Sequence, residues 1–187
     1  DLPLISAIRG PVDAGTYAIV QKLFSIIPLG LSLLWVPLWP IYRQALAAGD
    51  HAWVFRTLRR SLLLAILLAG VGATALALGF SQITTLWLHK HIIVSGTVIY
   101  GFLIWSVLDS FGGALAAFLN AASILRYQVI IAIIFGICCI TAKYFLLQSL
   151  SFNVLPWATS IVYLLTWLLP LLVLSPKITK LTLKKRF

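Results

Sequence analysis

Acidic residues are scarce in this sequence, which has four Asp and no Glu among its 187 residues. Charged residues of both signs make up only 10%, against about 25% in soluble domains. The chain therefore lacks the side chains that a water-facing surface needs, which excludes a globular cytosolic enzyme and a disordered tail. The only two cysteines, Cys138 and Cys139, are adjacent within an apolar run, which excludes a disulfide scaffold.

Hydrophobic residues are abundant instead, at 61% of the chain with a mean hydropathy of +1.06. Lys and Arg together number 14, which gives a net charge of +10. In a polar chain this excess would indicate nucleic acid binding. Here the basic residues gather in a few clusters between apolar runs, the pattern typical of segments beside anionic lipid headgroups. We predict an integral membrane protein that contacts membrane lipids and binds no nucleic acid.

Five apolar runs are long enough to cross a bilayer. A spanning helix needs about 20 mostly apolar residues, because each residue rises roughly 1.5 Å through a hydrocarbon core about 30 Å thick. We therefore predict an all-α protein with full transmembrane helices at residues 17–39, 61–82, 92–119, 129–147 and 154–174. Residues 1–8 are apolar but too few to cross, so we interpret them as the end of a truncated sixth helix in a fragment of a longer chain.

The basic residues predict the orientation of these helices. Ten Lys and Arg lie on one side of the predicted spans, in two loops and in the tail 175–187, and only Arg9 and Lys90 lie on the other side. Cytoplasmic loops carry the excess of Lys and Arg. The C-terminal tail is therefore expected in the cytoplasm.

The longest connection, residues 40–60, contains two helix signals. Pro40 suits a first helical turn, and Asp50 can cap a helix that begins at His51. Within that helix, Arg56, Arg59 and Arg60 share a face. The pattern favours a helix at the inner membrane interface with its basic side towards lipid phosphates; a role in admitting an anionic substrate remains the alternative.

No catalytic constellation is visible. The three histidines fall in two loops predicted on opposite sides of the membrane, and no Ser or Thr has a His and an acid beside it. His89 and His91 alone are weak metal ligands, and a solvated outer loop explains them better. We expect no enzyme, no cofactor and no bound metal.

Three ionisable side chains lie where a charge is costly. A charge at mid-bilayer costs about 2.5–3.5 kcal/mol on insertion scales. Asp109, nearer the cytoplasmic end of the third span, is a candidate for ion coupling or gating, or a structural partner of a neighbouring helix. Lys143 lies one turn from the outer end of its span, which favours snorkelling to the surface over a place in a lumen. Lys22 lies beside Gln21, which favours a polar lumen.

Two backbone patterns bear on helix packing. Pro28 with Gly30 predicts a kink near the middle of the first span, because Pro removes a backbone hydrogen bond and clashes with the preceding turn. Such breaks often lie beside transport cavities. Small residues recur every four positions at 113, 117 and 121, and at 112 and 116. They predict close packing of the third span against a neighbour.

Several stretches resemble one family of transporters. Ala7–Tyr17 (AIRGPVDAGTY), followed by Gln-Lys-Leu at 21–23, is similar to the start of the second half of polysaccharide-export flippases of the multidrug/oligosaccharidyl-lipid/polysaccharide (MATE-like) superfamily. Pro37–Ala45 (PLWPIYRQA), with Ala-Gly-Asp at 48–50 and the Arg-rich helix, resembles their cytoplasmic connection. Asn120–Ala122 is similar to a small-residue loop of that family.

The resemblance implies one lobe of a two-lobe, twelve-helix transporter, from the end of span seven to span twelve. Members move undecaprenyl-pyrophosphate-linked oligosaccharides across the bacterial inner membrane by alternating access, for surface polysaccharides such as lipopolysaccharide. Expected partners are the missing N-terminal lobe, the lipid-linked glycan, and the polysaccharide polymerase and chain-length machinery. A cationic cavity would receive the pyrophosphate, with Lys22, Lys143 and Arg43 as candidates and Asp109 for the coupling ion.

Three alternatives remain. A MATE-type drug or cation exporter would carry more acids than this chain has, so the excess of bases favours an anionic substrate. A membrane-embedded transferase would need catalytic residues at a span end, and the short loops are nearly free of acids. A non-transport membrane subunit would need no site at all.

Overall fold

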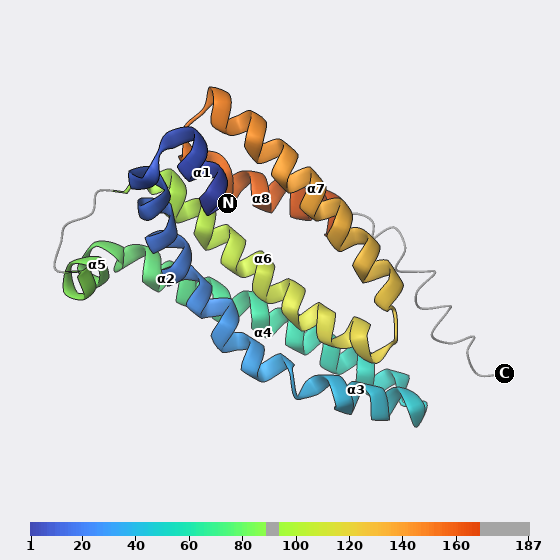
Figure 1. Ribbon diagram of the computed structural model, residues 1–187. Helices are drawn as coiled ribbons and strands as arrows, with labels where there is room; N and C mark the ends of the chain where they lie inside the picture. The colour runs from blue at the N-terminus through green and yellow to red at the C-terminus, as the bar shows by residue number, and fades with distance from the viewer. Residues whose placement is uncertain (89–93, 169–187) are drawn as a thin grey trace.

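The computed structural model describes residues 1–88 and 94–168, and this part of the chain is almost entirely helical (Figure 1). It contains no strand, as the all-α prediction requires. The helices in chain order are α1 (Leu2–Arg9), α2 (Pro11–Trp35), α3 (Leu38–Ala47), α4 (His51–Leu78), α5 (Phe80–Leu88), α6 (Gly96–Ala121), α7 (Leu125–Ser149) and α8 (Leu155–Tyr163), with a 3-10 turn before α8 (Phe152–Val154) and a π-helical turn after it (Leu164–Leu168).

Four helical segments are long and apolar enough to cross a membrane: Pro11–Ala47, His51–Leu78, Gly96–Ala121 and Gln128–Ser149. They confirm the coarse prediction of an all-α protein of membrane type. The described part of the fifth predicted span, residues 154–168, is helical throughout. Residues 169–174 lie outside the described ranges, as does the whole tail 175–187. Residues 2–9 form the short helix α1.

The first span ends earlier than the predicted residue 39, because α2 ends at Trp35. After a turn at 36–37 the helix α3 begins at Leu38, so Pro40 lies in its first turn as predicted. The side chain of Asp50 accepts a hydrogen bond of 3.0 Å from the backbone N–H of Trp53, which confirms it as the cap of α4. This helix then continues without a break to Leu78. The arginines at 56, 59 and 60 therefore belong to the same helix that is long and apolar enough to cross a membrane.

α6 is the central helix, and small residues bring α4 against it. On α4, the buried side chains recur every four positions, at Ser61, Ala65, Ala69 and Ala73. Of these, Ala65 shares an apolar cluster with the small buried residues Ala114 and Ala117 of α6. Short side chains let two helix backbones approach closely, which membrane helices use in place of a hydrophobic driving force. The predicted stripe on α6 is thus confirmed at 117 and 121, whereas Gly113 is exposed.

Two glycines of α6 hold α8 close on another side. A Cβ on Gly112 would lie 2.1 Å from the hydroxyl oxygen of Tyr163, and a Cβ on Gly101 would lie 2.9 Å from Pro156 and Trp157. Any larger residue would separate the helices at these points. α7 lies outside this core, with α8 and α1 as its main neighbours (Figure 1).

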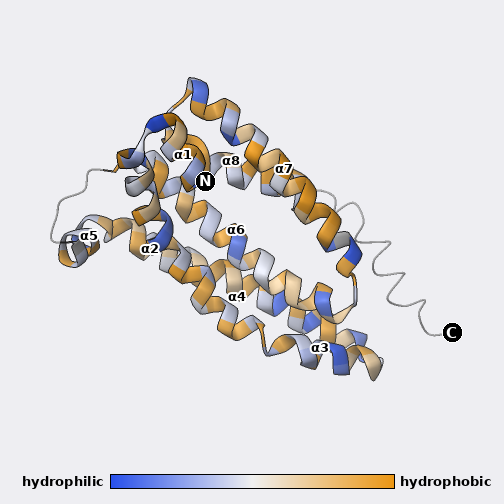
Figure 2. Cartoon of the chain, viewed as in Figure 1, coloured by the Kyte–Doolittle hydropathy of each residue, from blue (hydrophilic) through white to orange (hydrophobic). Residues whose placement is uncertain are grey.

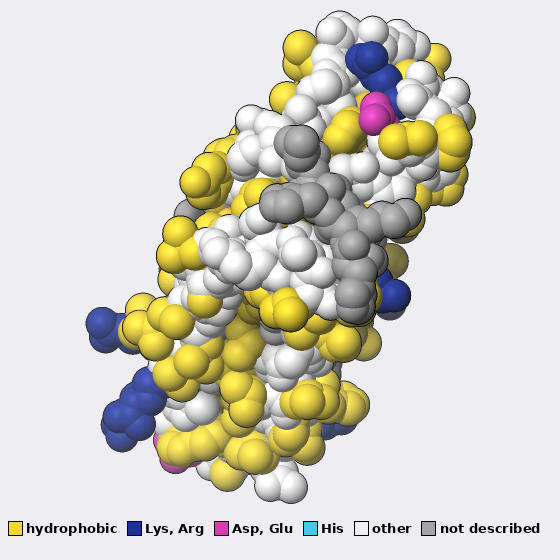
Figure 3. All heavy atoms as spheres, turned by 90° about the vertical axis from the view of Figure 1, so that its left-hand side faces the viewer, with side chains coloured by type: hydrophobic (Ala, Val, Ile, Leu, Met, Phe, Trp, Pro, Cys, Tyr) yellow, Lys and Arg dark blue, Asp and Glu magenta, His cyan; other side chains and the backbone are white. Residues whose placement is uncertain are grey.

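The polar residues gather towards the helix ends, and long apolar stretches lie between them (Figure 2). Hydrophobic side chains cover much of the face drawn in Figure 3, where Lys and Arg are few. α3, the start of α4 and the end of α6 share one apolar cluster. This end of the bundle carries five exposed arginines: Arg43, Arg56, Arg59, Arg60 and Arg126.

Candidate functional site

A partly buried ion pair joins α7 to the residue that precedes α1. The Nζ atom of Lys143 donates to both carboxylate oxygens of Asp1, at 2.7 and 2.8 Å. The Tyr17 hydroxyl on α2 donates to the same carboxylate at 2.9 Å. The interaction thus ties together three segments that are distant in sequence.

Lys143 is only 6% exposed, so its side chain does not snorkel to the surface, and the interpretation favoured by its place in the sequence is wrong. A charge inside a protein is stable only if a partner and hydrogen bonds replace its lost hydration. Asp1 provides the opposite charge for Lys143, and Tyr17 satisfies a further lone pair of the carboxylate.

A cavity of about 320 Å³ lies beside this ion pair, and Asp1, Tyr17 and Lys143 form part of its wall. Aromatic side chains from α6 and α7, Trp105 and Phe135, form part of its wall, with a ring-centroid separation of 6.3 Å and nearly parallel planes. Gln21 of α2 and Thr159 of α8 add hydrogen-bonding groups. The cavity therefore combines a charged pair, aromatic surfaces and polar groups within the helix bundle.

Asp109 lies in different surroundings. It occupies the middle of α6, with 13 residues before it and 12 after it in the helix Gly96–Ala121. Its side chain is exposed and lines a second cavity of about 430 Å³, together with Ser25, Pro28 and Ser32 of α2. Asp109 forms no salt bridge within residues 1–88 and 94–168.

Pro28 forms the α2 wall of that second cavity. α2 remains helical through Pro28 and Gly30, and a Cβ on Gly30 would meet nothing within 4 Å. Because Pro28 has no N–H, the carbonyl oxygen of Phe24 loses its helical donor. The hydroxyl of Ser106 on α6 donates to this oxygen at 3.3 Å. α6 thus satisfies the acceptor that the proline leaves free.

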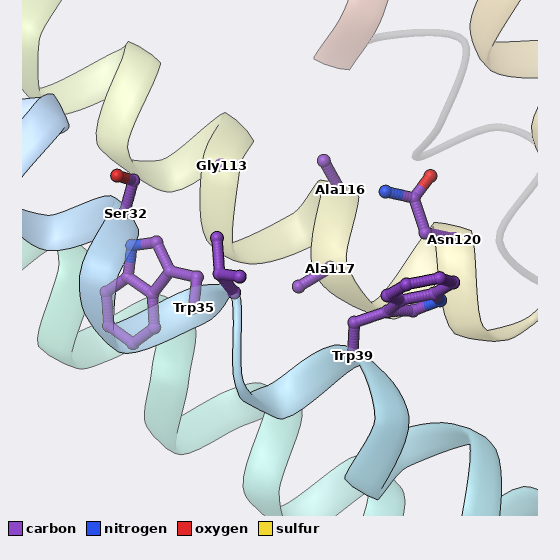
Figure 4. Close-up of a pocket in the computed structure, with 8 residues that line it drawn as sticks. Ser32, Trp35, Trp39, Gly113, Ala116, Ala117 and Asn120 are labelled. Carbon is purple, nitrogen blue, oxygen red and sulfur yellow. The ribbon is translucent and has the colours of Figure 1, made fainter.

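A third cavity, of about 280 Å³, continues from the second towards the arginine-rich end. The two share Ser32 and Gly113. We call the third cavity the tryptophan groove; it is lined by Ser32, Trp35, Val36, Trp39, Gly113, Ala116, Ala117 and Asn120 (Figure 4).

Lys22 and Arg43 do not join Lys143. Both side chains are exposed, and neither is among the residues that line these three cavities. Lys22 follows Gln21, which does line the ion-pair cavity. Arg43 lies one turn beyond Trp39 on α3. The sequence thus predicted Lys143 as a candidate site residue, but no sequence pattern predicts that Asp1 and Tyr17 bind it.

The remaining chemistry-bearing residues form no further cluster in the described ranges. No group of three His, Cys, Asp or Glu side chains is placed to hold a metal ion there. The candidate chemistry therefore rests on the ion pair of Lys143 and Asp1 and on the open carboxylate of Asp109.

Comparisons with family models, curated proteins and solved structures found no match to this chain.

Proposed function

We propose that this chain forms the C-terminal lobe of a transporter that moves undecaprenyl-pyrophosphate-linked oligosaccharide across the bacterial inner membrane by alternating access. The observation that carries the proposal is the buried Lys143 at the wall of a cavity between membrane-type helices. A lysine whose role is only to stabilise the fold through an ion pair needs no cavity beside it. The resemblance of residues 7–17 and 37–50 to polysaccharide-export flippases supports the same function.

The ion-pair cavity has the chemistry that a sugar–phosphate substrate needs. An ammonium group binds phosphate oxygens through charge-assisted hydrogen bonds. Lys143 would exchange its contact with Asp1 for a contact with the anion in one state of the transport cycle. The ring faces of Trp105 and Phe135 suit the apolar faces of sugars, and Gln21 and Thr159 suit sugar hydroxyls. Lys22 and Arg43, although outside this cavity, would extend a cationic path.

Asp109 would bind the coupling ion. Its carboxylate lies at the midpoint of α6 in a cavity with two serine hydroxyls, Ser25 and Ser32. A carboxylate with hydroxyl oxygens is a suitable set of ligands for a proton or a small hard cation. Movement of α2 around Pro28 would open or close this cavity.

A drug or cation exporter of MATE type is a second candidate, and one observation favours it. Among the residues that the structure describes, the cavity at Asp109 is lined by a carboxylate and by no Lys or Arg, so its charge suits a cation better than a pyrophosphate. The proposed partners of the first candidate, an opposing N-terminal lobe and the polymerase and chain-length machinery, would have no role in a drug exporter.

A deletion strain tests the proposal. If the function is correct, cells without the gene accumulate the lipid-linked oligosaccharide on the cytoplasmic leaflet and lose surface polymer, and the full-length native gene restores both. Lys143→Gln fails to restore transport although the protein reaches the membrane. Normal surface polymer in the deletion strain, together with hypersensitivity to cationic drugs, would reject the flippase in favour of the exporter.

A further inference from the structure

The tryptophan groove contains hydrogen-bond donors for which the described chain supplies no acceptor. The indole Nε1 of Trp35 is buried and has no hydrogen-bond partner among the described residues, and the whole side chain is only 5% exposed. A buried donor without an acceptor costs about 1–3 kcal/mol. An acceptor from outside the chain would remove that cost.

Asn120 places a second donor in the same groove. Its Oδ1 atom accepts a hydrogen bond of 3.1 Å from Nε2 of Gln128 on α7. No described residue accepts a hydrogen bond from the amide nitrogen of Asn120. In Figure 4 that nitrogen points towards Ala116, which also lines the groove. The groove therefore presents the amide of Asn120 to its occupant, whereas the indole N–H of Trp35 is buried within its wall.

The walls of the groove suit a hydrocarbon chain, and its mouth suits an anion. Val36, Ala116, Ala117 and the ring of Trp39 give a mainly apolar lining. Arg43 follows one turn beyond Trp39 on the same helix, at the end of the bundle that has five exposed arginines. The acid at that end, Asp50, is already bonded to the backbone of α4.

We propose that the tryptophan groove binds an anionic phospholipid of the surrounding bilayer. The phosphate accepts hydrogen bonds from the amide of Asn120 and the guanidinium of Arg43, and an acyl chain lies along Val36, Ala116 and Trp39. Tryptophan at the interface and arginine beside it match the headgroup region of a membrane. The inference concerns the bilayer itself, so it stands whether or not the chain moves a lipid-linked glycan.

Tryptophan fluorescence measures this binding directly. The full-length native protein is placed in phosphatidylcholine nanodiscs, and dibrominated phosphatidylglycerol is titrated in, because bromine quenches an indole only on contact. The expected result is quenching that saturates at a low mole fraction, with dibrominated phosphatidylcholine quenching less. Trp39→Phe removes the saturable component, since Trp39 is the most open indole of the groove, at 46% exposed.

A matched pair of substitutions separates specific binding from bulk charge. Asn120→Asp keeps the shape and the acceptor for Gln128 but replaces the donor with a negative oxygen. It should raise the mole fraction of dibrominated phosphatidylglycerol at half-saturation about tenfold, the fold-change expected when one charge-assisted hydrogen bond is lost. Asn153→Asp makes the same charge change beside α8, at the opposite end of α7, and should have no effect. Arg43→Gln should weaken binding in the same direction as Asn120→Asp.

Three outcomes would overturn the inference. Equal quenching by the two brominated lipids would mean that the groove does not select an anionic headgroup. Equal effects of Asn120→Asp and Asn153→Asp would leave only a general response to charge. Saturable quenching that persists in Trp39→Phe would place the lipid elsewhere on the protein.

Discussion

The two ionisable side chains at 109 and 143 differ because of what their neighbours provide. Lys143 is enclosed, and the Asp1 carboxylate replaces the hydration that the ammonium loses. Within residues 1–88 and 94–168, no Lys or Arg lines the cavity at Asp109, and the Asp109 side chain stays open to that cavity. A buried charge without a partner is far more costly than an exposed one. Lys143 therefore contributes to folding through its pair, whereas Asp109 is available to an external cation.

Loss of Lys143 should leave the Asp1 carboxylate, whose side chain is 22% exposed, without its ammonium partner. We expect Lys143→Met to lower the free energy of unfolding by less than the ~3–5 kcal/mol lost when one partner of a fully buried pair is removed, because water still reaches Asp1. Titration with sodium dodecyl sulfate, followed by circular dichroism, measures it. Asp1→Asn in the Lys143→Met background should recover a large part of the loss. Additive effects of the two substitutions would show that the pair is not coupled.

The hydrogen bond from Ser106 to the Phe24 carbonyl gives a second prediction. Ser106→Ala should lower the free energy of unfolding by about 0.6–1 kcal/mol, the usual worth of a hydrogen bond between membrane helices. The same substitution should cost less in a Pro28→Ala protein, because an alanine at that position supplies the missing backbone N–H to Phe24. A double-mutant cycle from unfolding titrations checks this, and a coupling of zero would exclude the proposed compensation.

The positions of small side chains decide which helices of this protein pack against each other. α4 meets α6 where Ala65 packs with Ala114 and Ala117, and α8 meets α6 where Gly101 and Gly112 leave room. In lipid, apolar side chains gain little from leaving the hydrocarbon, so close backbone approach and dispersion contacts decide which helices pair.

Gly112→Ala is expected to disturb the contact between α6 and α8. The new Cβ would lie 2.1 Å from the hydroxyl oxygen of Tyr163, and such overpacking costs about 1–3 kcal/mol. Unfolding titration should show that loss, and Tyr163→Phe should relieve part of it by removing the hydroxyl. Gly70→Ala on α4 is the control, because its Cβ meets nothing within 4 Å. Equal losses at both glycines would refute the packing argument.

At the scale of the whole molecule, the ends of the bundle differ in charge. Five exposed arginines gather where α3, the start of α4, the end of α6 and the start of α7 meet. At the other end, Arg9 donates a hydrogen bond to the carbonyl of Leu150, which follows α7. The fold thus brings together loops that are distant in sequence but carry the same charge, in agreement with the bias between sides that predicts orientation.

Cysteine labelling tests that orientation. In a protein whose native cysteines are replaced by Ala, Ser123→Cys lies in the exposed turn between α6 and α7, and Ser151→Cys lies in the exposed turn after α7. A membrane-impermeant thiol reagent added to intact cells should label position 151 alone, and position 123 should react only after the membrane is opened. The reverse pattern would invert the orientation argued from the basic residues.

Composition and periodicity alone determined that this chain is helical and of membrane type, because long apolar runs cannot satisfy their backbone groups in lipid except as helices. They also predicted the cap at Asp50 and part of the small-residue stripe on α6, since both depend on neighbours within one or two turns.

The tertiary structure decided what depends on contacts distant in sequence. Lys143 stands 142 positions from Asp1, and Ser106 stands 82 positions from Phe24, so no local spacing relates them. Snorkelling of Lys143 was the reasonable prediction from its place near a helix end. It is wrong because the carboxylate of Asp1, from another segment, binds the ammonium inside the fold. The environment of an intramembrane charge is set by the helix packed beside it, and packing is a property of the whole fold.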